Sequence, residues 1–187
     1  MQMSNRGGRT VAMTARGVVE SSGRDAGKPL DVTIQQAARE PRRLLARTDD
    51  AGQAFRLIGF YPNMLGGRMQ LDVNLDGGGN ADKTGRLYVE RFSILGDPVE
   101  ATGEGAVSPR GQRRMERPRL DFDSMNAPFE LGHGYLVIKD ADVRGQVLGV
   151  LLTGRVDFRS QRLDLGGTYV PLQGLNSAIG NFPILGQ

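Results

Sequence analysis

The chain has 187 residues, a formal net charge of +3, 27 glycines, no cysteine and a hydrophobic fraction of 39%. This length allows one domain with a buried core, and the lack of cysteine excludes a disulfide framework and a thiolate metal site. No stretch approaches the roughly 18 consecutive apolar residues of a membrane-spanning helix, and no apolar signal-peptide core follows Met1.

Short strand-like runs dominate the beginning of the chain. Residues 10–18 and 30–35 are two such runs, separated by the turn-rich segment 21–29, and residues 43–48 form a third, weaker run. Glycines spread along the chain without a collagen-like period also favour strands joined by tight turns.

One helix is expected in this half, over residues 51–61. Asp49 and Asp50 offer an N-cap, and Pro62 ends the helical pattern. The apolar stripe of the expected helix consists of Ala54, Phe55, Leu57 and Ile58.

The clearest alternation of apolar and polar residues lies in residues 67–76. A turn then leads to a returning strand over 85–94, where the apolar order slips at Arg91 and Phe92 and predicts a β-bulge. The apolar residues of this pair of strands are Met69, Leu71, Val73, Leu75, Leu87, Val89 and Ile94.

The C-terminal half continues as strands with short connections. The expected strands cover residues 120–122, 129–131, 135–140, 147–158 and 161–169, with a hairpin turn at 159–162. Pro171 stops the last strand, and the spacing of Leu172, Leu175, Ile179 and Phe182 predicts a short C-terminal helix. Successive strands with short turns indicate an antiparallel meander.

The positive charge is concentrated in residues 109–119. This segment holds Arg110, Arg113, Arg114, Arg117 and Arg119 without interleaved aromatic residues. Proteins that bind single-stranded nucleic acid add stacking aromatic residues to such basic segments. A solvated loop is therefore the favoured interpretation, ahead of contact with an anionic membrane or headgroup and ahead of nucleic acid.

Three motifs imitate ligand sites, and each lacks an essential residue. Residues 72–77 begin like a calcium-binding EF-hand loop, but Lys83 stands where the closing Glu is required. Residues 77–84 imitate a phosphate-binding P-loop, but Asp82 replaces its last Gly. Gly103-Glu-Gly105 lacks the third Gly of a dinucleotide fingerprint. We expect no metal and no cofactor.

No set of residues supports catalysis. His133 is the single histidine and lies between two glycines, where a turn is the ordinary interpretation, and no nucleophile elbow accompanies it. Asp140 and Asp142 could share a strand face as an acid–base pair, but exposed acids at a strand end are common. Asn176 and Ser177 are interpreted as a cap or turn contact. We expect that the protein is not an enzyme.

The last residues of the chain resemble the C-terminal region of the AsmA-like family of Gram-negative envelope proteins, which typically reads "ldl.Gt.vP..gLNs.lg.iPllG". Residues 129–141, 144–149 and 154–158 also look like this family, as does the segment 51–68 with its Gly-Gly-Arg turn. The matching C-terminal positions are Leu163, Leu165, Gly167, Thr168, Pro171, Gly174, Leu175, Asn176, Ser177, Gly180, Pro183, Leu185 and Gly186.

This resemblance implies a curved, open antiparallel sheet that forms a trough or half-barrel and moves phospholipid between the inner and outer membranes. It further implies a periplasmic module of a protein anchored in the inner membrane by a segment outside this chain. Residues 1–187 would then be a single AsmA-like C-terminal domain, truncated at both ends. The implied partners are phospholipid acyl chains rather than nucleic acid, while protein partners in the envelope stay unknown.

Two alternatives remain open at this stage. An apolar sheet face must be covered, curl on itself or bind an apolar ligand, so the same residues serve either as an open groove or as a closed core. The module could also support outer-membrane assembly without carrying lipid. The candidates for the lipid-facing interior are Met69, Leu71, Val73, Leu75, Leu87, Val89, Leu136, Ile138, Val156, Phe158, Leu163 and Leu165.

Overall fold

The computed structural model describes residues 1–7, 9–19, 27–37, 39–76, 83–96, 99–100, 115–160 and 162–171. These residues form a 10-stranded sheet, a separate two-stranded ribbon and the helix α1 (Ala51–Leu57). The strands are β1 (Gln2–Arg6), β2 (Arg9–Val19), β3 (Lys28–Gln35), β4 (Arg43–Thr48), β5 (Met64–Asn74), β6 (Lys83–Leu95), β7 (Val99–Glu100), β8 (Met115–Glu116), β9 (Arg119–Leu131), β10 (Tyr135–Gly145), β11 (Leu148–Asp157) and β12 (Arg162–Pro171).

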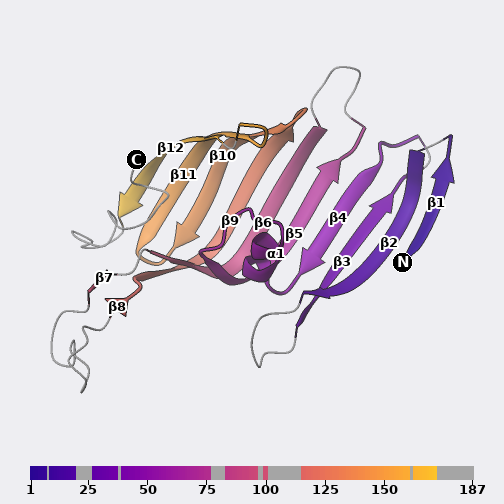
Figure 1. Ribbon diagram of the computed structural model, residues 1–187. Coiled ribbons are helices and arrows are strands. Elements are labelled where there is room, and N and C mark those ends of the chain that lie inside the picture. Colours follow the sequence, from indigo (N-terminus) through magenta and orange to yellow (C-terminus); the bar gives the residue numbers. More distant parts are fainter. Residues whose placement is uncertain are drawn as a thin grey trace.

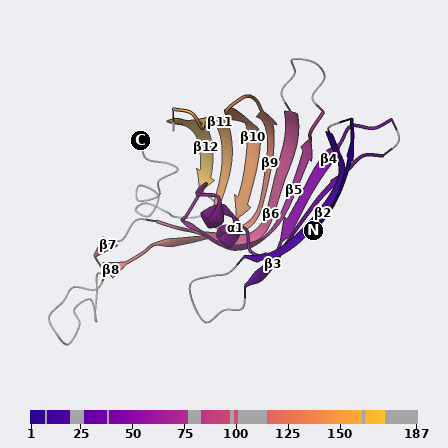
Figure 2. The ribbon, with the colours of Figure 1, turned by 45° about the vertical axis from the view of Figure 1, so that its right-hand side comes forward.

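The large sheet is an antiparallel meander that curves across its strands into an open trough. Its order is β1-β2-β3-β4-β5-β6-β9-β10-β11-β12, so chain neighbours pair throughout except where β7 and β8 leave the sheet between β6 and β9. Figures 1 and 2 show the curvature and place α1 on the concave side, at the lower ends of the central strands. The predicted curved, open, antiparallel β fold is confirmed.

Several predicted strands are longer in the structure. The runs predicted at residues 120–122 and 129–131 belong to one strand, β9, so the prediction of two separate strands is wrong. The polar side chains of β9, Asp121, Asp123, Ser124 and Asn126, alternate with apolar ones except at the consecutive Asp123 and Ser124, since only one face of the strand is covered. The sequence analysis also missed β1, which pairs with the upper half of β2.

Backbone irregularities bend the central strands at their lower ends. Gly66 and Gly67 in β5 have φ angles of 63° and 92°, and Arg91 in the neighbouring β6 has a φ of 52°. The register runs unshifted past Arg91, since Glu90 pairs with Arg68 and Phe92 with Gly66, so the predicted β-bulge, which requires an extra residue in one strand, is wrong. Beyond this point Phe92 and Phe122 turn into the core and stack with their ring centroids 5.2 Å apart. The positive φ angles of Gly67 and Arg91, at matching positions of the two strands, account for the slip in the apolar order.

The helix begins as predicted and ends earlier. The Asp50 carboxylate accepts the backbone N–H of Gln53 at 2.9 Å, which is an N-cap hydrogen bond. Gly59 adopts a φ of 65°, and the backbone N–H of Phe60 donates to the Phe55 carbonyl at 2.9 Å, so the chain reverses directly after α1. The helix docks by residues 51–55, all of which are buried.

The predicted apolar stripe of this helix is correct only in part. Ala54 and Phe55 are buried, but Leu57 and Ile58 are 68% and 70% exposed. Because α1 ends at Leu57, it lacks the further turn that would carry these two residues back to the sheet. The prediction that they belong to the buried stripe is wrong.

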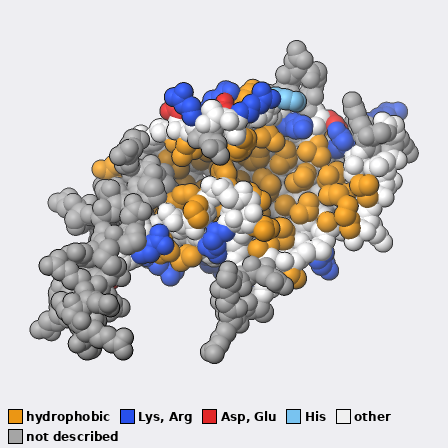
Figure 3. Space-filling view, viewed as in Figure 1, with side chains coloured by type: hydrophobic (Ala, Val, Ile, Leu, Met, Phe, Trp, Pro, Cys, Tyr) orange, Lys and Arg blue, Asp and Glu red, His pale blue; other side chains and the backbone are white. Residues whose placement is uncertain are grey.

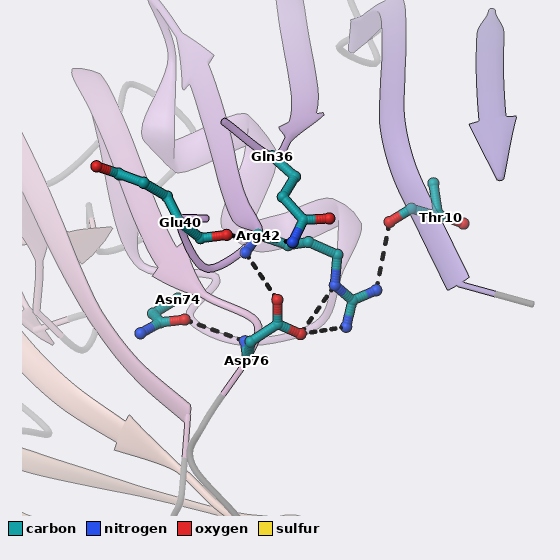
Figure 4. A network of polar contacts seen from close by, with 6 residues as sticks. All are labelled: Thr10, Gln36, Glu40, Arg42, Asn74 and Asp76. Atoms are coloured by element: carbon teal, nitrogen blue, oxygen red, sulfur yellow. Dashed lines mark hydrogen bonds and ion pairs between the residues drawn. The ribbon is translucent and has the colours of Figure 1, made fainter. Parts of the chain in front are cut away.

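A polar network joins strands at the upper end of the sheet (Figure 4). The Arg42 guanidinium donates to the Asp76 carboxylate through Nε at 2.9 Å and Nη2 at 2.6 Å, and it also reaches the Thr10 carbonyl. The backbone N–H of Arg42 donates to the same carboxylate at 2.8 Å. This network ties the turn before β4 to β2 and to the end of β5.

Two predicted segments lie largely beyond the described residues. The C-terminal helix expected after Pro171 falls outside them entirely. Of the Arg-rich segment 109–119, the structure describes only its end, where Arg119 opens β9 and pairs with Asp121 at 2.8 Å. Arg117 is exposed and donates to the Gly96 carbonyl at 3.2 Å, so this end is ordered on the protein.

Candidate functional site

The strand register collects apolar side chains on one face of the sheet. Met69 pairs with Val89 and Leu71 with Leu87 between β5 and β6. Opposed residues in a sheet point to the same side and successive residues alternate, so these pairs define the face. Toward the two edges, the same face continues through Leu44, Ala46, Val32, Ile34, Ala15 and Met13, and through Met125, Ala127, Val143, Val150, Leu152, Gly167 and Tyr169.

This apolar surface is the hollow side of the trough, and we call it the concave face. Figure 3 looks onto it and shows hydrophobic side chains gathered across the central strands. The opposite, convex face carries cross-strand ion pairs. These pairs are Arg16–Asp31, Arg43–Asp72, Lys139–Glu130 and, along one strand, Arg144–Asp142. The sheet is therefore amphipathic over its whole width.

The lower end of the concave face is closed by α1. Val89 is 0% exposed and Met69 is 6% exposed, and both belong to a core cluster that includes Ala51 and Phe55 of the helix. Close contact in this core depends on glycine. A Cβ at Gly52 of α1 would lie 2.4 Å from the Met64 carbonyl oxygen of β5, and a Cβ at Gly67 would lie 2.8 Å from Val89 Cγ1 and 3.0 Å from Phe92 Cβ of the neighbouring strand β6. At this end the closed-core interpretation is correct.

The upper part of the concave face is more open. Leu71, Leu87, Leu136, Ile138, Val156 and Leu165 are half-buried. Leu163 is 64% exposed, although it lies on the apolar face opposite Val156. Among the described residues no second layer of sheet or helix lies over these strands (Figure 2). Open surface and closed core therefore coexist on this face: α1 closes the lower end, and the more open upper part still contains a buried patch at Val73 and Phe129, which are 6% and 9% exposed.

The register places all the predicted interior residues on the concave face except two. Leu75 follows the last residue of β5, where its backbone N–H donates to the Arg42 carbonyl at 2.8 Å. Phe158 lies in the turn after β11 and is 48% exposed. The ten-stranded sheet also brings residues that the sequence analysis did not select to this face. They include Met13, Ile34, Leu44, Met125, Phe129, Val143, Val150 and Leu152.

A sequence signal for the missed residues existed. Leu30, Val32 and Ile34 alternate with polar residues, as do Met125, Ala127 and Phe129. The second series was obscured because two consecutive polar residues, Asp123 and Ser124, interrupt the period at the bend. Apolar residues that alternate on both sides of two consecutive polar residues form the pattern that would have identified the missed residues of β9.

The residues set aside for catalysis have structural roles or lie at the surface. His133 is exposed in the turn between β9 and β10. Asp140 has a φ of 46° and lies in a bulge of β10, which breaks the alternation that would have put it on one face with Asp142. The Asp142 carboxylate instead accepts from Arg144 at 2.6 Å. This hydrogen bond raises the pKa of the Arg144 guanidinium.

The imitation calcium motif also follows strand geometry where it is described. Asp72 lies in β5 and pairs with Arg43 across to β4. Within the described ranges, no group of three or more His, Asp and Glu side chains is placed to hold a metal ion. None of the helices in those ranges is long and apolar enough to cross a membrane.

The family-like C-terminal residues are only partly described. Gly167 and Pro171 lie in β12, and a Cβ at Gly167 would stand 2.4 Å from the Leu151 carbonyl oxygen. That close approach is a physical reason for glycine at this position. The other signature residues, Gly174, Leu175, Asn176, Ser177, Gly180, Pro183 and Gly186, lie outside the described residues. Comparisons with protein-family models, curated proteins and solved structures find no match to this chain, so its resemblance to the AsmA-like family stays a prediction.

Proposed function

We propose that the concave face holds the acyl chains of phospholipid, and that the protein is a non-catalytic module of a trough that moves phospholipid between the inner and outer membranes of a cell envelope. In this proposal the module lies in the periplasm and is anchored through a segment outside this chain.

The observation that carries the proposal is an apolar face extending from β2 to β12 with one seven-residue helix as its cover in the described part of the chain. A sheet normally buries its apolar face against a second layer. Contiguous exposed apolar surface of this kind marks interaction sites. An acyl chain is unbranched and apolar, so it can follow a groove floored by Leu, Val, Ile and Met side chains.

The proposal is tested by extracting the purified protein with organic solvent and identifying bound lipid by mass spectrometry. Leu71→Glu and Leu136→Glu put a carboxylate on the concave face, where burial against an acyl chain is costly. The matched controls Gln70→Glu and Val137→Glu introduce the same group on the opposite face of the same strands. We expect the concave variants to retain at most about a fifth of the wild-type lipid and the controls to resemble wild type.

Two other results would contradict acyl-chain binding on the concave face. If no phospholipid co-purifies, and if the folded protein takes up none from labelled vesicles, then an assembly module that carries no lipid becomes the better proposal. Equal lipid content in the concave variants and their controls would locate binding elsewhere on the protein.

A further inference from the structure

A single charged residue interrupts the apolar concave face of the central and C-terminal strands. Of the paired positions that the register assigns to this face in β4, β5, β6, β9, β10, β11 and β12, above the bend at Arg91, Lys83 alone is charged. Lys83 pairs with Leu131 at the uppermost position of β6, and its side chain is exposed. The ammonium group therefore stands at the upper mouth of the trough.

Further cations lie in the turns beside this mouth. The turn after Leu131 carries His133, and the Arg159 side chain of the β11–β12 turn lies against it, because a Cβ at Gly134 would be 2.7 Å from Arg159 Nε. Arg162 begins β12 opposite Asp157. Figure 3 shows Lys and Arg side chains gathered along this upper rim, next to the histidine and above the apolar face.

The described acidic groups next to the turns at 132–134 and 158–160 either accept hydrogen bonds or lie on the convex face. Asp157 accepts the backbone N–H groups of Arg159 and Ser160 at 3.0 Å and 2.9 Å. Asp164 stands opposite Arg155 in the register, on the convex face. Glu130 pairs with Lys139 on that same face at 2.5 Å. Lys83 and Arg159 form no ion pair with a described residue, so no described carboxylate neutralises them. Arg162 precedes Leu163 and pairs with Asp157 in the strand register, which places it on the convex face.

The two ends of the trough therefore differ in chemistry. The lower end is closed by α1 and a dry core, whereas the upper end is open and cationic. From the bend at Gly67 to Asn74, β5 extends for roughly 23 Å at about 3.3 Å per residue. One leaflet of a bilayer core is roughly 15 Å thick, half of about 30 Å. A lipid tail thus fits between the helix and the rim.

We propose that the trough binds its lipid in one orientation and prefers an anionic headgroup. The headgroup phosphate lies at the upper rim near Lys83 and Arg159, and the acyl chains run along the strands toward α1. This inference rests on the proposed acyl-binding function and adds the class of lipid and its direction.

Headgroup preference is tested with two lysolipids of the same acyl length, lysophosphatidylglycerol and lysophosphatidylcholine, titrated into the protein below their micellar concentrations. We expect wild-type protein to bind the anionic lysolipid at least about fivefold more tightly, since each basic residue near an anionic lipid contributes about 1 kcal/mol. In Lys83→Gln/Arg159→Gln this ratio falls toward one. The matched variant Arg47→Gln/Arg86→Gln removes the same charge from the convex face and keeps the ratio.

Orientation is tested with a lysophosphatidylglycerol that carries a photoreactive diazirine at the end of its acyl chain, followed by mass spectrometry of the labelled peptides. We expect labelling near α1, in the peptides that hold Phe55, Met125 or Leu152, and little labelling at Leu131 or Leu136.

The outcomes separate the two proposals. Binding of both lysolipids with equal affinity, or terminal labelling at the upper rim, overturns the inference and leaves the acyl-binding function standing. If neither lysolipid binds, both proposals fail.

Discussion

At the scale of single residues, Arg42 connects three strands through one guanidinium. Its side chain is 18% exposed and meets Asp76, which is 27% exposed, while the raised pKa of Arg42 reflects first the hydrogen bonds to this carboxylate. Hydrogen bonds to charged groups contribute more to stability than neutral ones when they are shielded from water.

Replacing Arg42 is therefore expected to destabilise the protein. Arg42→Met should lower the free energy of unfolding by about 1.5–3 kcal/mol, measured by urea denaturation. Arg16→Met is the control, because the Arg16–Asp31 pair is 79% and 45% exposed and exposed pairs contribute about 0–1 kcal/mol. Equal losses in the two variants would contradict a special role for the Arg42 network.

The Asp157 carboxylate, at the upper end of β11, is expected to make the stability of the protein depend on pH. Hydrogen bonds from Ser160, with smaller contributions from the Arg159 backbone N–H and the charge of Arg155, lower the pKa of Asp157 below its ordinary 3.8. A pKa that is lower in the folded state means that the contribution to stability is present above about pH 4 and is lost as the pH falls through the folded value.

We therefore expect Asp157→Asn to melt below wild type at pH 7 and to converge with it as the pH falls below 3.8 through the lower folded pKa of Asp157. Thermal melting followed by circular dichroism between pH 2 and pH 7 measures this convergence. Asp164→Asn removes a carboxylate that lacks such backbone hydrogen bonds and should show a smaller difference at pH 7. A constant gap between wild type and Asp157→Asn down to pH 2 would rule out the linkage.

At the scale of elements, the close approach of β5 and β6 beside α1 involves the paired glycines of β5. Gly66 and Gly67 both have positive φ angles, but only Gly67 lacks space for a Cβ. Substitutions at the two positions therefore distinguish the cost of backbone strain, which applies to both, from the cost of close packing, which applies only to Gly67.

Gly66→Ala should cost about 1 kcal/mol, the strain of placing an L-residue in this conformation. Gly67→Ala should cost about 2–4 kcal/mol, since overpacking against Val89 and Phe92 adds roughly 1–3 kcal/mol. Chemical denaturation of both variants gives the comparison. If the two losses are equal, the Val89 and Phe92 side chains can move aside without penalty, and the described contact is not a tight one.

At the scale of the whole molecule, stability is concentrated in the middle of the sheet. The main core cluster takes its residues from α1, β5, β6, β9, β10 and β11, while β1, β2, β3 and β12 contribute none within the described residues. In that part of the chain, β1 and β12 are also paired on one side only.

Amide hydrogen exchange should follow this distribution, because segments with few buried contacts open locally at low free energy. We expect peptides from β5, β6 and β9 to exchange at least about tenfold more slowly than peptides from β1 and β2, as measured by mass spectrometry. Uniform protection across the ten strands would indicate that the sheet opens only as one unit. If the lipid proposal holds, bound lysolipid should slow exchange in β10 and β11 more than in β1.

Much of this fold was predictable from local patterns. Alternation in residues 67–76 predicted β5, the slipped order at Arg91 marked the position of the bend although no bulge forms there, and Asp50 marked the start of α1. These features depend on a residue and its near neighbours. The errors arose where contacts outside the local sequence decided the structure. Pairing with the neighbouring strands keeps residues 123–128 within β9. The reversal at Gly59 ends α1 early and leaves Leu57 and Ile58 exposed.

The sequence by itself determined that the protein is an antiparallel meander with one apolar side and one short helix, because strand and helix periods are properties of consecutive residues. Only the tertiary structure decided that α1 closes one end of the concave face while Lys83 and Arg159 lie at the other. Those positions depend on register and curvature across ten strands, which bring together residues that are far apart in the chain.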